Sequence, residues 1–171
     1  ISPRMIEIAK ANVRGVDFRV GSVYELPYKS RYFDIVVSSY VVEHFEDLDA
    51  AFKEVKRVLK KRGLFIFSIG NPVTGSAHHI KGKPDTLLKF GDYFNEEKHT
   101  STWAMRRYRV KIPWFRRTYE TWIKAIVKNG FVIEDYIDAR PPARSKKVDR
   151  KSYEYASKVP QVCVFKVKVK T

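Results

Sequence analysis

The residues best suited to chemistry follow the end of a buried strand. Ile35 to Val37 are three consecutive β-branched residues with no polar residue between them, which is typical of a parallel strand covered on both faces. Ser38, Ser39 and Tyr40 come next. Ligands of open α/β sheets bind just beyond the carboxyl ends of the strands, where small hydroxyl residues leave room and offer hydrogen bonds. A core strand that runs into a polar turn is the alternative.

The segments before this stretch are predicted to be a helix and a strand. Ser2 suits a helix cap, and Pro3 suits the first position of a helix that runs to Asn12. Apolar and polar residues alternate from Val16 to Val20, which predicts a short strand. A loop is expected to connect this strand to the next one.

A second helix and strand are predicted after the Ser-Ser-Tyr turn. Asp47 suits an N-cap, and the following apolar residues lie on one helical face, at Leu48, Phe52, Val55 and Leu59. We expect Gly63 to end the helix in the left-handed conformation. The dense apolar run from Leu64 to Ile69 predicts a strand. Helix and strand alternate with short connections, which indicates parallel strands in an α/β layer architecture.

Regular structure is expected again near the C-terminus. Apolar periodicity predicts a helix from Thr118 to Gly130 and a strand from Phe131 to Ile137. The basic segment from Arg140 to Tyr155 contains two prolines and is predicted to be an exposed loop. Apolar residues alternate with lysines from Gln161 to Lys170, which is typical of a strand near a sheet edge that lysines guard against pairing.

The segment from Gly70 to Phe115 shows no clear periodicity. A stretch of this length in one domain is usually a lid or a binding insertion, and a short helix from Pro84 to Phe90 is one expectation. Adjacent His78 and His79 would point to opposite sides of a strand, and no carboxylate stands at ligand spacing from them or from His99, so no metal site is expected.

Aromatic and arginine residues interleave in this insertion. The aromatics could line an apolar acceptor pocket or simply hold the insertion on the core. The arginines could clamp an anionic acceptor or RNA phosphates, or form a solvated face. The residues concerned are Tyr93, Phe94, Trp103, Tyr108, Trp114, Phe115, Arg106, Arg107, Arg109, Arg116 and Arg117.

Composition sets wider bounds on the class of protein. The 171 residues suffice for one domain with a core. No segment approaches the roughly 20 apolar residues of a membrane span, and the first twelve residues do not resemble a signal peptide. Cys163 is the only cysteine, which excludes an intrachain disulfide and fits a reducing cytoplasm. The net charge of +15 favours anionic partners such as RNA, or reflects a lysine-rich solvated surface.

In order and spacing, these elements resemble the class I S-adenosylmethionine-dependent methyltransferases, and among them the small-molecule branch called type 11. The resemblance depends on ISPRMIEIAKAN (1–12), VDFRVGSVYELPY (16–28), FDIVVSSYVVEH (33–44), the helix and strand over 47–69, and NGFVIE (129–134). Together these segments cover essentially the whole chain except the insertion.

The resemblance implies a fold and an extent. The sheet would be Rossmann-like and mostly parallel, with an antiparallel last strand between its neighbours. The first strands and the Gly-rich cofactor loop would precede Ile1, so the chain would be N-terminally incomplete. Residues 1–171 would form a single partial methyltransferase domain, with an irregular lid at 70–115. Upstream strands or a second copy of the chain would then cover the apolar faces of the inner strands.

The resemblance also implies a cofactor and its binding residues. S-adenosylmethionine would pack its adenine near Ile1, and Ser22 and Val23 would read the adenine edge, with Ser22 standing where the family commonly has Asp. Ser38, Ser39 and Tyr40 would line the methionine portion. His44 matches a common histidine before the next helix. His44 is the one candidate general base, and a helix-entry histidine bonded to the backbone is the alternative.

Three functions remain open from the sequence. The first is methyl transfer to a small-molecule acceptor, which the match to the type 11 branch favours. The second is an RNA methyltransferase, which the positive charge favours. The third is a non-catalytic fragment that binds no cofactor, which Ser22 in place of Asp would fit. The nucleophile of the acceptor is not identified by any motif.

Overall fold

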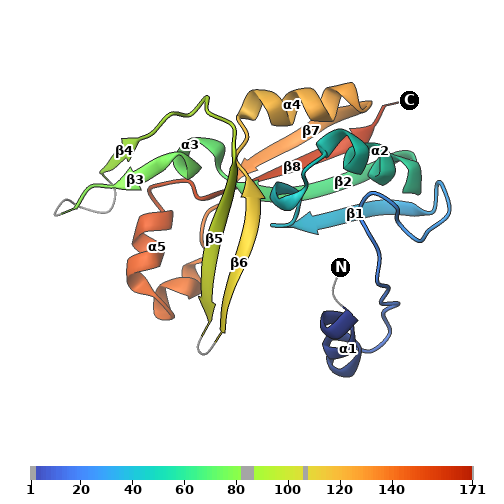
Figure 1. Ribbon diagram of the computed structural model, residues 1–171, viewed down its shortest axis with the longest axis horizontal. Helices are drawn as coiled ribbons and strands as arrows, with labels where there is room; N and C mark the ends of the chain where they lie inside the picture. The colour runs from blue at the N-terminus through green and yellow to red at the C-terminus, as the bar shows by residue number, and fades with distance from the viewer. Residues whose placement is uncertain (1–2, 82–86, 106–107, 171) are drawn as a thin grey trace.

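A four-stranded sheet forms the centre of the protein. The computed structural model describes residues 3–81, 87–105 and 108–170. The strand order is β1 (Phe33–Ser39), β2 (Leu59–Gly70), β8 (Val162–Val169) and β7 (Phe131–Asp138). Strand β1 is parallel to β2, and β8 is antiparallel to both β2 and β7 (Figure 1). The predicted antiparallel last strand between two neighbours is therefore confirmed.

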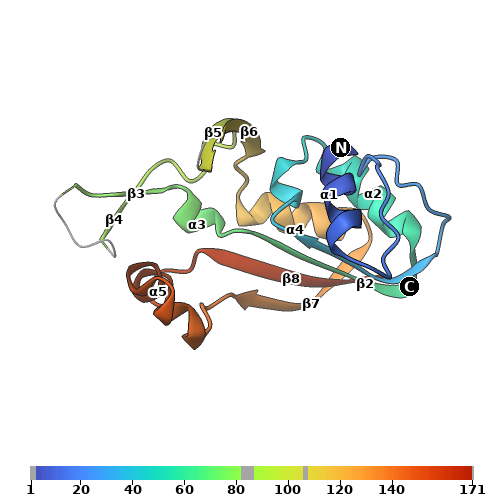
Figure 2. The ribbon, with the colours of Figure 1, turned by 90° about the horizontal axis from the view of Figure 1, so that it is seen from below.

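Two helices cover one face of this sheet and enclose the core. Helix α2 (Leu48–Val58) begins at Asp47, whose carboxylate accepts a hydrogen bond from the Ala50 amide. Helix α4 (Tyr119–Lys128) begins at Thr118, whose hydroxyl accepts from the Thr121 amide. Both helices lie on the same side of the strands (Figure 2). Their apolar stripes supply this side of the core because residues three and four apart share a helix face.

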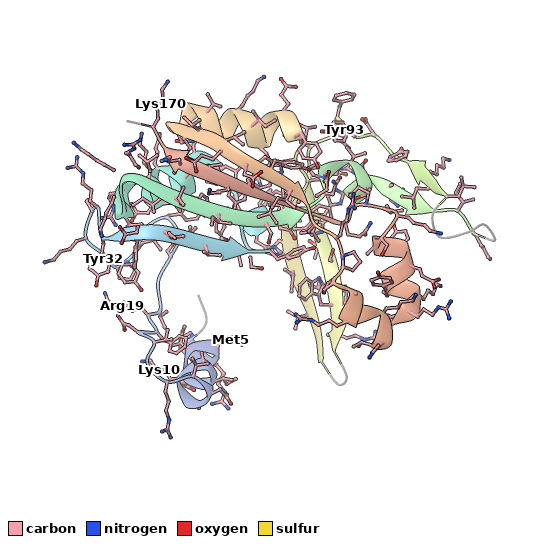
Figure 3. All side chains as sticks on the ribbon, turned by 180° about the vertical axis from the view of Figure 1, so that it is seen from behind. Met5, Lys10, Arg19, Tyr32, Tyr93 and Lys170 are labelled. Carbon is pink, nitrogen blue, oxygen red and sulfur yellow. The ribbon has the colours of Figure 1, made fainter. Side chains whose placement is uncertain are left out.

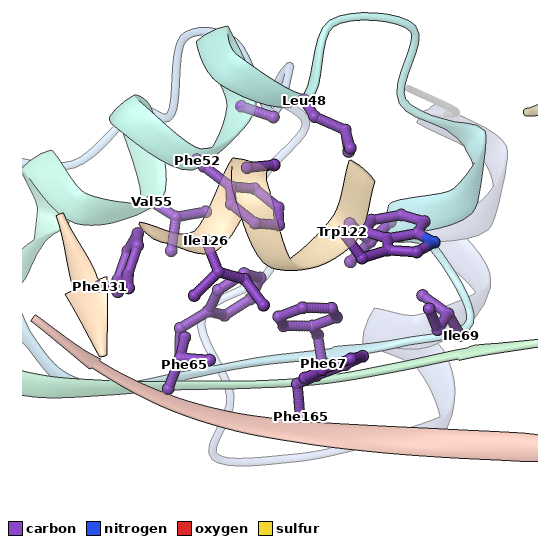
Figure 4. Packing of buried hydrophobic residues seen from close by; sticks show 14 of the residues in the cluster. Leu48, Phe52, Val55, Phe65, Phe67, Ile69, Trp122, Ile126, Phe131 and Phe165 are labelled. Carbon is purple, nitrogen blue, oxygen red and sulfur yellow. The ribbon is translucent and has the colours of Figure 1, made fainter. Parts of the chain in front are cut away.

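Aromatic rings fill the space between the helices and the sheet. Phe67 of β2 lies 5.6 Å from Phe52 of α2, 6.1 Å from Trp122 of α4 and 5.3 Å from Phe165 of β8, measured between ring centroids (Figure 4). All four side chains are at most 2% exposed. This aromatic layer links α2, α4, β2 and β8 into one packed unit.

The opposite face of the sheet is largely open. Ile35 and Val37 of β1 are 52% and 68% exposed, and among the described residues β1 pairs only with β2. Helix α1 (Pro3–Asn12) buries no residue, and its side chains Met5 and Lys10 lie well away from the strands (Figure 3). Covering of this face by upstream strands or by a second copy stays a prediction.

The expected strand from Val16 to Val20 is wrong. The segment has no strand conformation, and Val16 and Val20 are 55% and 45% exposed. An alternating pattern gives a strand only where a neighbouring strand supplies backbone partners. In the part of the chain that the structure describes, no strand pairs with this segment.

The turn from α2 into β2 also differs from the prediction. Arg62, with φ of 61°, takes the left-handed conformation there, and Gly63 does not. Gly63 is buried, and a Cβ built on it would lie 3.0 Å from the Lys60 carbonyl oxygen and 3.2 Å from that of Asp34. Gly63 is needed for the close approach of β1 to β2, while Gly130 at the end of α4 has the left-handed φ of 75°.

The insertion is more regular than expected. It contains a short helix, α3 (Pro72–Gly75), and two antiparallel pairs: β3 (Ala77–His79) with β4 (Leu88–Phe90), and β5 (Lys98–Met105) with β6 (Tyr108–Phe115). Leu88–Phe90 is a strand, which contradicts the expected helix there, and positions 82–86 lie outside the described residues.

Two C-terminal expectations are corrected as well. The expected loop from Arg140 to Tyr155 contains a 3-10 turn, η2 (Ala143–Lys147), and helix α5 (Arg150–Ala156), which Asp149 caps by accepting from the Ser152 amide. Strand β8 lies next to the edge strand β7, as expected, but it has partners on both sides, so its lysines do not guard an unpaired edge. Its Lys166 and Lys168 form ion pairs with Glu134 of β7 at 3.3 and 2.7 Å, which keeps these charges on an inner strand.

No helix within the described residues has both the length and the apolar character needed to cross a membrane.

Candidate functional site

A pocket of about 200 Å³ lies beyond the carboxyl end of β2. Its walls come from the end of β2 at Ile69 and Gly70, from the 3-10 turn η1 (Val42–His44), and from the β5–β6 hairpin. All three tryptophans of the chain line it, at Trp103, Trp114 and Trp122. The pocket is therefore mostly apolar and lies where open α/β sheets bind ligands.

Glu43 fixes one edge of this pocket. Its Oε2 atom accepts a hydrogen bond of 2.9 Å from the Gly70 amide, the last residue of β2. A carboxylate that accepts from a backbone amide forms a stronger bond than a neutral acceptor does. Glu43 thereby ties η1 to the end of the strand.

We predict that Glu43→Ala lowers the free energy of unfolding by about 1–3 kcal/mol, because the Gly70 amide loses its acceptor. Glu43→Gln keeps an acceptor oxygen and should lose less than half as much. Chemical denaturation of both variants measures the difference. Equal losses for alanine and glutamine would show that the charge matters and the hydrogen bond does not.

His44 joins η1 to the hairpin. Its Nδ1 atom lies 2.7 Å from the carbonyl oxygen of Pro113 in β6. Since a carbonyl only accepts, Nδ1 carries the proton in this contact, and Nε2 of the neutral ring is left as an acceptor. His44 also lines the pocket. The backbone-bonded histidine and the base candidate are thus compatible, because the two roles use different ring nitrogens.

Arg117 lies behind the same turn. Its Nη2 donates to the carbonyl oxygens of Phe45 and Glu46 at 2.6 and 2.9 Å. The guanidinium lies over the rings of Phe115 and Trp122, with centroid distances of 4.9 and 5.5 Å. Burial lowers the pKa of Arg117. These contacts hold the pocket wall against the η1 turn.

The other insertion residues have separate surroundings. Arg116 also lines the pocket, but it bonds to Glu97 at 3.1 Å and to the Asn95 carbonyl oxygen at 2.8 Å. His99 stacks on Trp114, with ring centroids 4.7 Å apart. Arg106 and Arg107 lie outside the described residues. No group of three potential metal ligands occurs within the described ranges.

A second pocket, of about 580 Å³, contains three of the predicted cofactor residues. Ser22, Val23 and Ser38 line it together, with Val36 and Phe45 among the apolar side chains around them. This volume is within the range of about 300–1,000 Å³ usual for small-molecule sites. A hydroxyl among apolar walls fits the edge and faces of an adenine ring. The Ser22 hydroxyl accepts from the Tyr24 amide at 3.2 Å and still has donor capacity.

The other predicted cofactor residues do not line this second pocket. Ser39 points to the opposite face of β1, because side chains alternate along a strand. Tyr40 has a left-handed φ of 56°, and its amide donates to the Ser68 carbonyl and hydroxyl oxygens at 3.2 and 3.1 Å. Ile1 lies outside the described residues. The Tyr40 conformation turns the chain sharply out of β1 toward η1.

Sequence reasoning assigned no role to Asn71. Asn71 caps α3 by accepting from the Val73 and Thr74 amides, donates to Asp138 at 3.3 Å, and lines the first pocket. The Asp138 carboxylate also accepts from Tyr136 at 2.8 Å, and burial raises the pKa of that tyrosine. The sequence feature that could have indicated this role is the Asn71-Pro72 pair directly after a buried strand, which is typical of a helix start.

Comparison with known proteins connects this geometry to a family. Residues 1–67 match the family described as "Methyltransferase domain". An uncharacterised protein of Methanocaldococcus jannaschii is 38% identical over 139 residues, covering 78% of this chain and 53% of that protein. A demethylmenaquinone methyltransferase of Thermotoga maritima is 32% identical over 65 residues, covering 38% of this chain and 28% of that enzyme. The chain thus spans about half, or less, of these curated relatives.

Solved structures agree with the fold. The crystal structure of an S-adenosylmethionine-dependent methyltransferase from Mesorhizobium loti superposes with a TM-score of 0.77 at 19% identity, covering 98% of this chain and 76% of that one. Residues 1–67 thus match a methyltransferase family, and the chain has the fold of the class I S-adenosylmethionine-dependent methyltransferases.

Proposed function

We propose that this protein transfers a methyl group from S-adenosylmethionine to a small-molecule acceptor. One observation carries the proposal: the adjacent residues His44 and Phe45 line different pockets. His44 lines the tryptophan-rich pocket at the end of β2, and Phe45 lines the pocket that contains Ser22, Val23 and Ser38. A donor and an acceptor bound in the two pockets would meet across the η1 turn.

The size and lining of the first pocket favour a small acceptor over a polymer. Its volume is about 200 Å³, and the β5–β6 hairpin covers it with indole rings. The Thermotoga relative is named for demethylmenaquinone, itself a small molecule. Both facts support an acceptor with an apolar or aromatic body, while the nucleophilic atom stays unassigned.

The chain's own residues would mainly hold the acceptor in place. Bound S-adenosylmethionine would supply a methyl group already activated on a sulfonium. Transfer is then an in-line displacement whose rate depends on placing the nucleophile near the methyl carbon, opposite the sulfur. Trp103, Trp114 and Trp122 would position the acceptor and exclude water. His44 Nε2 would take a proton when the acceptor is protonated at rest.

Two other functions are tested by separate measurements. An RNA methyltransferase is supported by the net charge of +15, and it requires an RNA affinity that falls steeply with salt. A non-catalytic fragment is supported by Ser22 in place of the family's usual Asp. Calorimetric titration of S-adenosylmethionine and S-adenosylhomocysteine into this chain and into a version extended upstream tests the non-catalytic alternative, and RNA binding measured at several salt concentrations tests the RNA alternative. Cofactor binding to neither protein would overturn the proposed function.

Ser22 offers a gain-of-affinity prediction. Ser22→Asp should strengthen binding of S-adenosylmethionine by roughly fivefold, because a charged acceptor for the adenine amino group bonds more strongly than a hydroxyl. An aspartate can also keep the local hydrogen bond to the Tyr24 amide. Ser157→Asp, at an exposed position that lines neither pocket, is the matched control and should leave the affinity unchanged. Titration calorimetry on the cofactor-binding form of the protein measures both variants.

A further inference from the structure

A strongly basic hollow lies at the opposite end of β2 from the proposed active site. Its volume is about 590 Å³, and it is bounded by the start of β2, helix α2 and the end of β8. Among the described residues, no acidic side chain lines it. The lining residues that carry positive charge are Arg31, Lys53, Lys56, Arg57, Lys60, Lys61 and Lys170.

Nearby acids neutralise only two of these cations. Arg57 forms two hydrogen bonds with Glu54, at 2.8 and 2.7 Å, and this contact lowers the pKa of Glu54. Lys60 bonds to both carboxylate oxygens of Asp34, at 2.9 and 2.8 Å. The remaining five cations have no ion pair with any described residue. Elsewhere on the surface, lysines at 124, 128, 166 and 168 each pair with an acid.

Backbone contacts fix the rim of this hollow. The Arg31 amide donates to the Arg57 carbonyl oxygen at 2.8 Å, and the Lys170 amide donates to the Gly130 carbonyl oxygen at 2.9 Å. The Lys56 amine occupies the space where a Cβ of Gly130 would stand. Three segments far apart in the sequence are therefore held together with their cations around one concavity.

Unpaired like charges around a concavity repel one another and focus positive potential into it. A compact anion with several charges would neutralise them together, and lysines bind phosphate oxygens well as point charges. Strand β2 separates this hollow from the tryptophan-lined pocket, because the hollow involves Leu59 at its start and the pocket involves Gly70 at its end. A twelve-residue strand spans on the order of 35 Å, so a ligand here would not occupy the acceptor pocket.

We propose that this basic hollow is a binding site for a multiply charged phosphate group. The group could belong to a free polyphosphate or nucleotide, or to the backbone of RNA, since both present clustered phosphate oxygens. The site goes beyond the proposed methyl transfer and does not depend on it.

The test uses two probes and two triple variants. Inorganic tripolyphosphate is titrated by calorimetry, and a fluorescein-labelled 15-nucleotide uridine RNA is followed by anisotropy, both in about 0.1 M salt, where surface charges are screened beyond roughly 10 Å. The site variant carries Lys53→Gln, Lys56→Gln and Lys61→Gln. The control variant carries Lys89→Gln, Lys147→Gln and Lys158→Gln, which removes the same charge from exposed lysines outside the hollow.

We expect the site variant to weaken binding of the preferred probe at least tenfold and the control variant to change it less than twofold. Tripolyphosphate binding at least as strong as RNA binding would identify a compact phosphate ligand. RNA binding about 100-fold stronger, with a salt slope that falls by about two in the site variant, would identify the polymer backbone. Equal losses in both variants, or no binding of either probe at millimolar concentration, would overturn the proposal. Thermal melting checks that both variants remain folded.

Discussion

Replacement of Phe67 by alanine is expected to lower the free energy of unfolding by about 3–5 kcal/mol, as is usual when a buried phenylalanine is truncated. Phe67 is 0% exposed, and its ring contacts Phe65, Phe52 and Phe165 at centroid distances of 4.8, 5.6 and 5.3 Å. These neighbours come from β2, α2 and β8, so they cannot close the cavity without moving whole elements.

Phe94→Ala is the matched control for this prediction. Its side chain is 80% exposed, so the same truncation should change stability by no more than about 0.5 kcal/mol. Urea denaturation followed by circular dichroism measures both variants. A loss below about 1.5 kcal/mol for Phe67→Ala would contradict the packing of the aromatic core.

Gly63→Val should destabilise the protein by about 2–3 kcal/mol, through overpacking between β1 and β2. A Cβ at this position already lies 3.0 Å from the Lys60 carbonyl oxygen and 3.1 Å from the Leu59 side chain, and the added methyl groups need still more room. Backbone oxygens cannot move aside as a flexible side chain can. The edge strand β1 would have to shift away from β2.

Gly75→Val provides the comparison, since nothing lies within 4 Å of a Cβ at Gly75. This substitution should change stability by less than about 1 kcal/mol, because the side chain has room there and valine is a better helix former than glycine. The two melting temperatures, measured side by side, test the prediction. Equal shifts would show that Gly63 is not in a tight contact.

The core elements were predictable because their signals are local. Helices α2 and α4 and strand β2 each bury one regular apolar stripe or run, and caps at Asp47 and Thr118 mark where the helices begin. The strand order was available only through the family resemblance, because periodicity does not specify which strands are neighbours.

The errors arose where long-range pairing decides the structure. The alternating residues at Val16 to Val20 pair with no strand within the described ranges, while alternation in β6, at Val110, Ile112 and Trp114, gives a real hairpin with β5. In β8 the lysines suggested an edge, but Glu134 of β7 neutralises them on an inner strand. These partners are distant in sequence, so no local pattern reveals them.

The candidate site was predictable only in part, because some of its residues are marked by local signals and others meet through long-range contacts. Ser22, Val23 and Ser38 do line one pocket, while the wall of the other pocket depends on how the β5–β6 hairpin folds back over η1. The hydrogen bond between His44 and Pro113 joins residues 69 positions apart. The interpretation of residues 70–115 as a lid on a single partial domain stays a prediction.

Because of where the tryptophans lie, their fluorescence can report ligand binding at the proposed acceptor pocket. Trp103, Trp114 and Trp122 are all the tryptophans in the chain, and all of them border one pocket of about 200 Å³. Indole emission responds to the polarity and packing around the ring, so all of the tryptophan fluorescence of this chain, excited selectively beyond the absorption of its ten tyrosines, originates at the proposed acceptor site. Unlabelled libraries of small molecules can therefore be screened directly. A non-absorbing compound that shifts the tryptophan emission is expected to bind at this pocket.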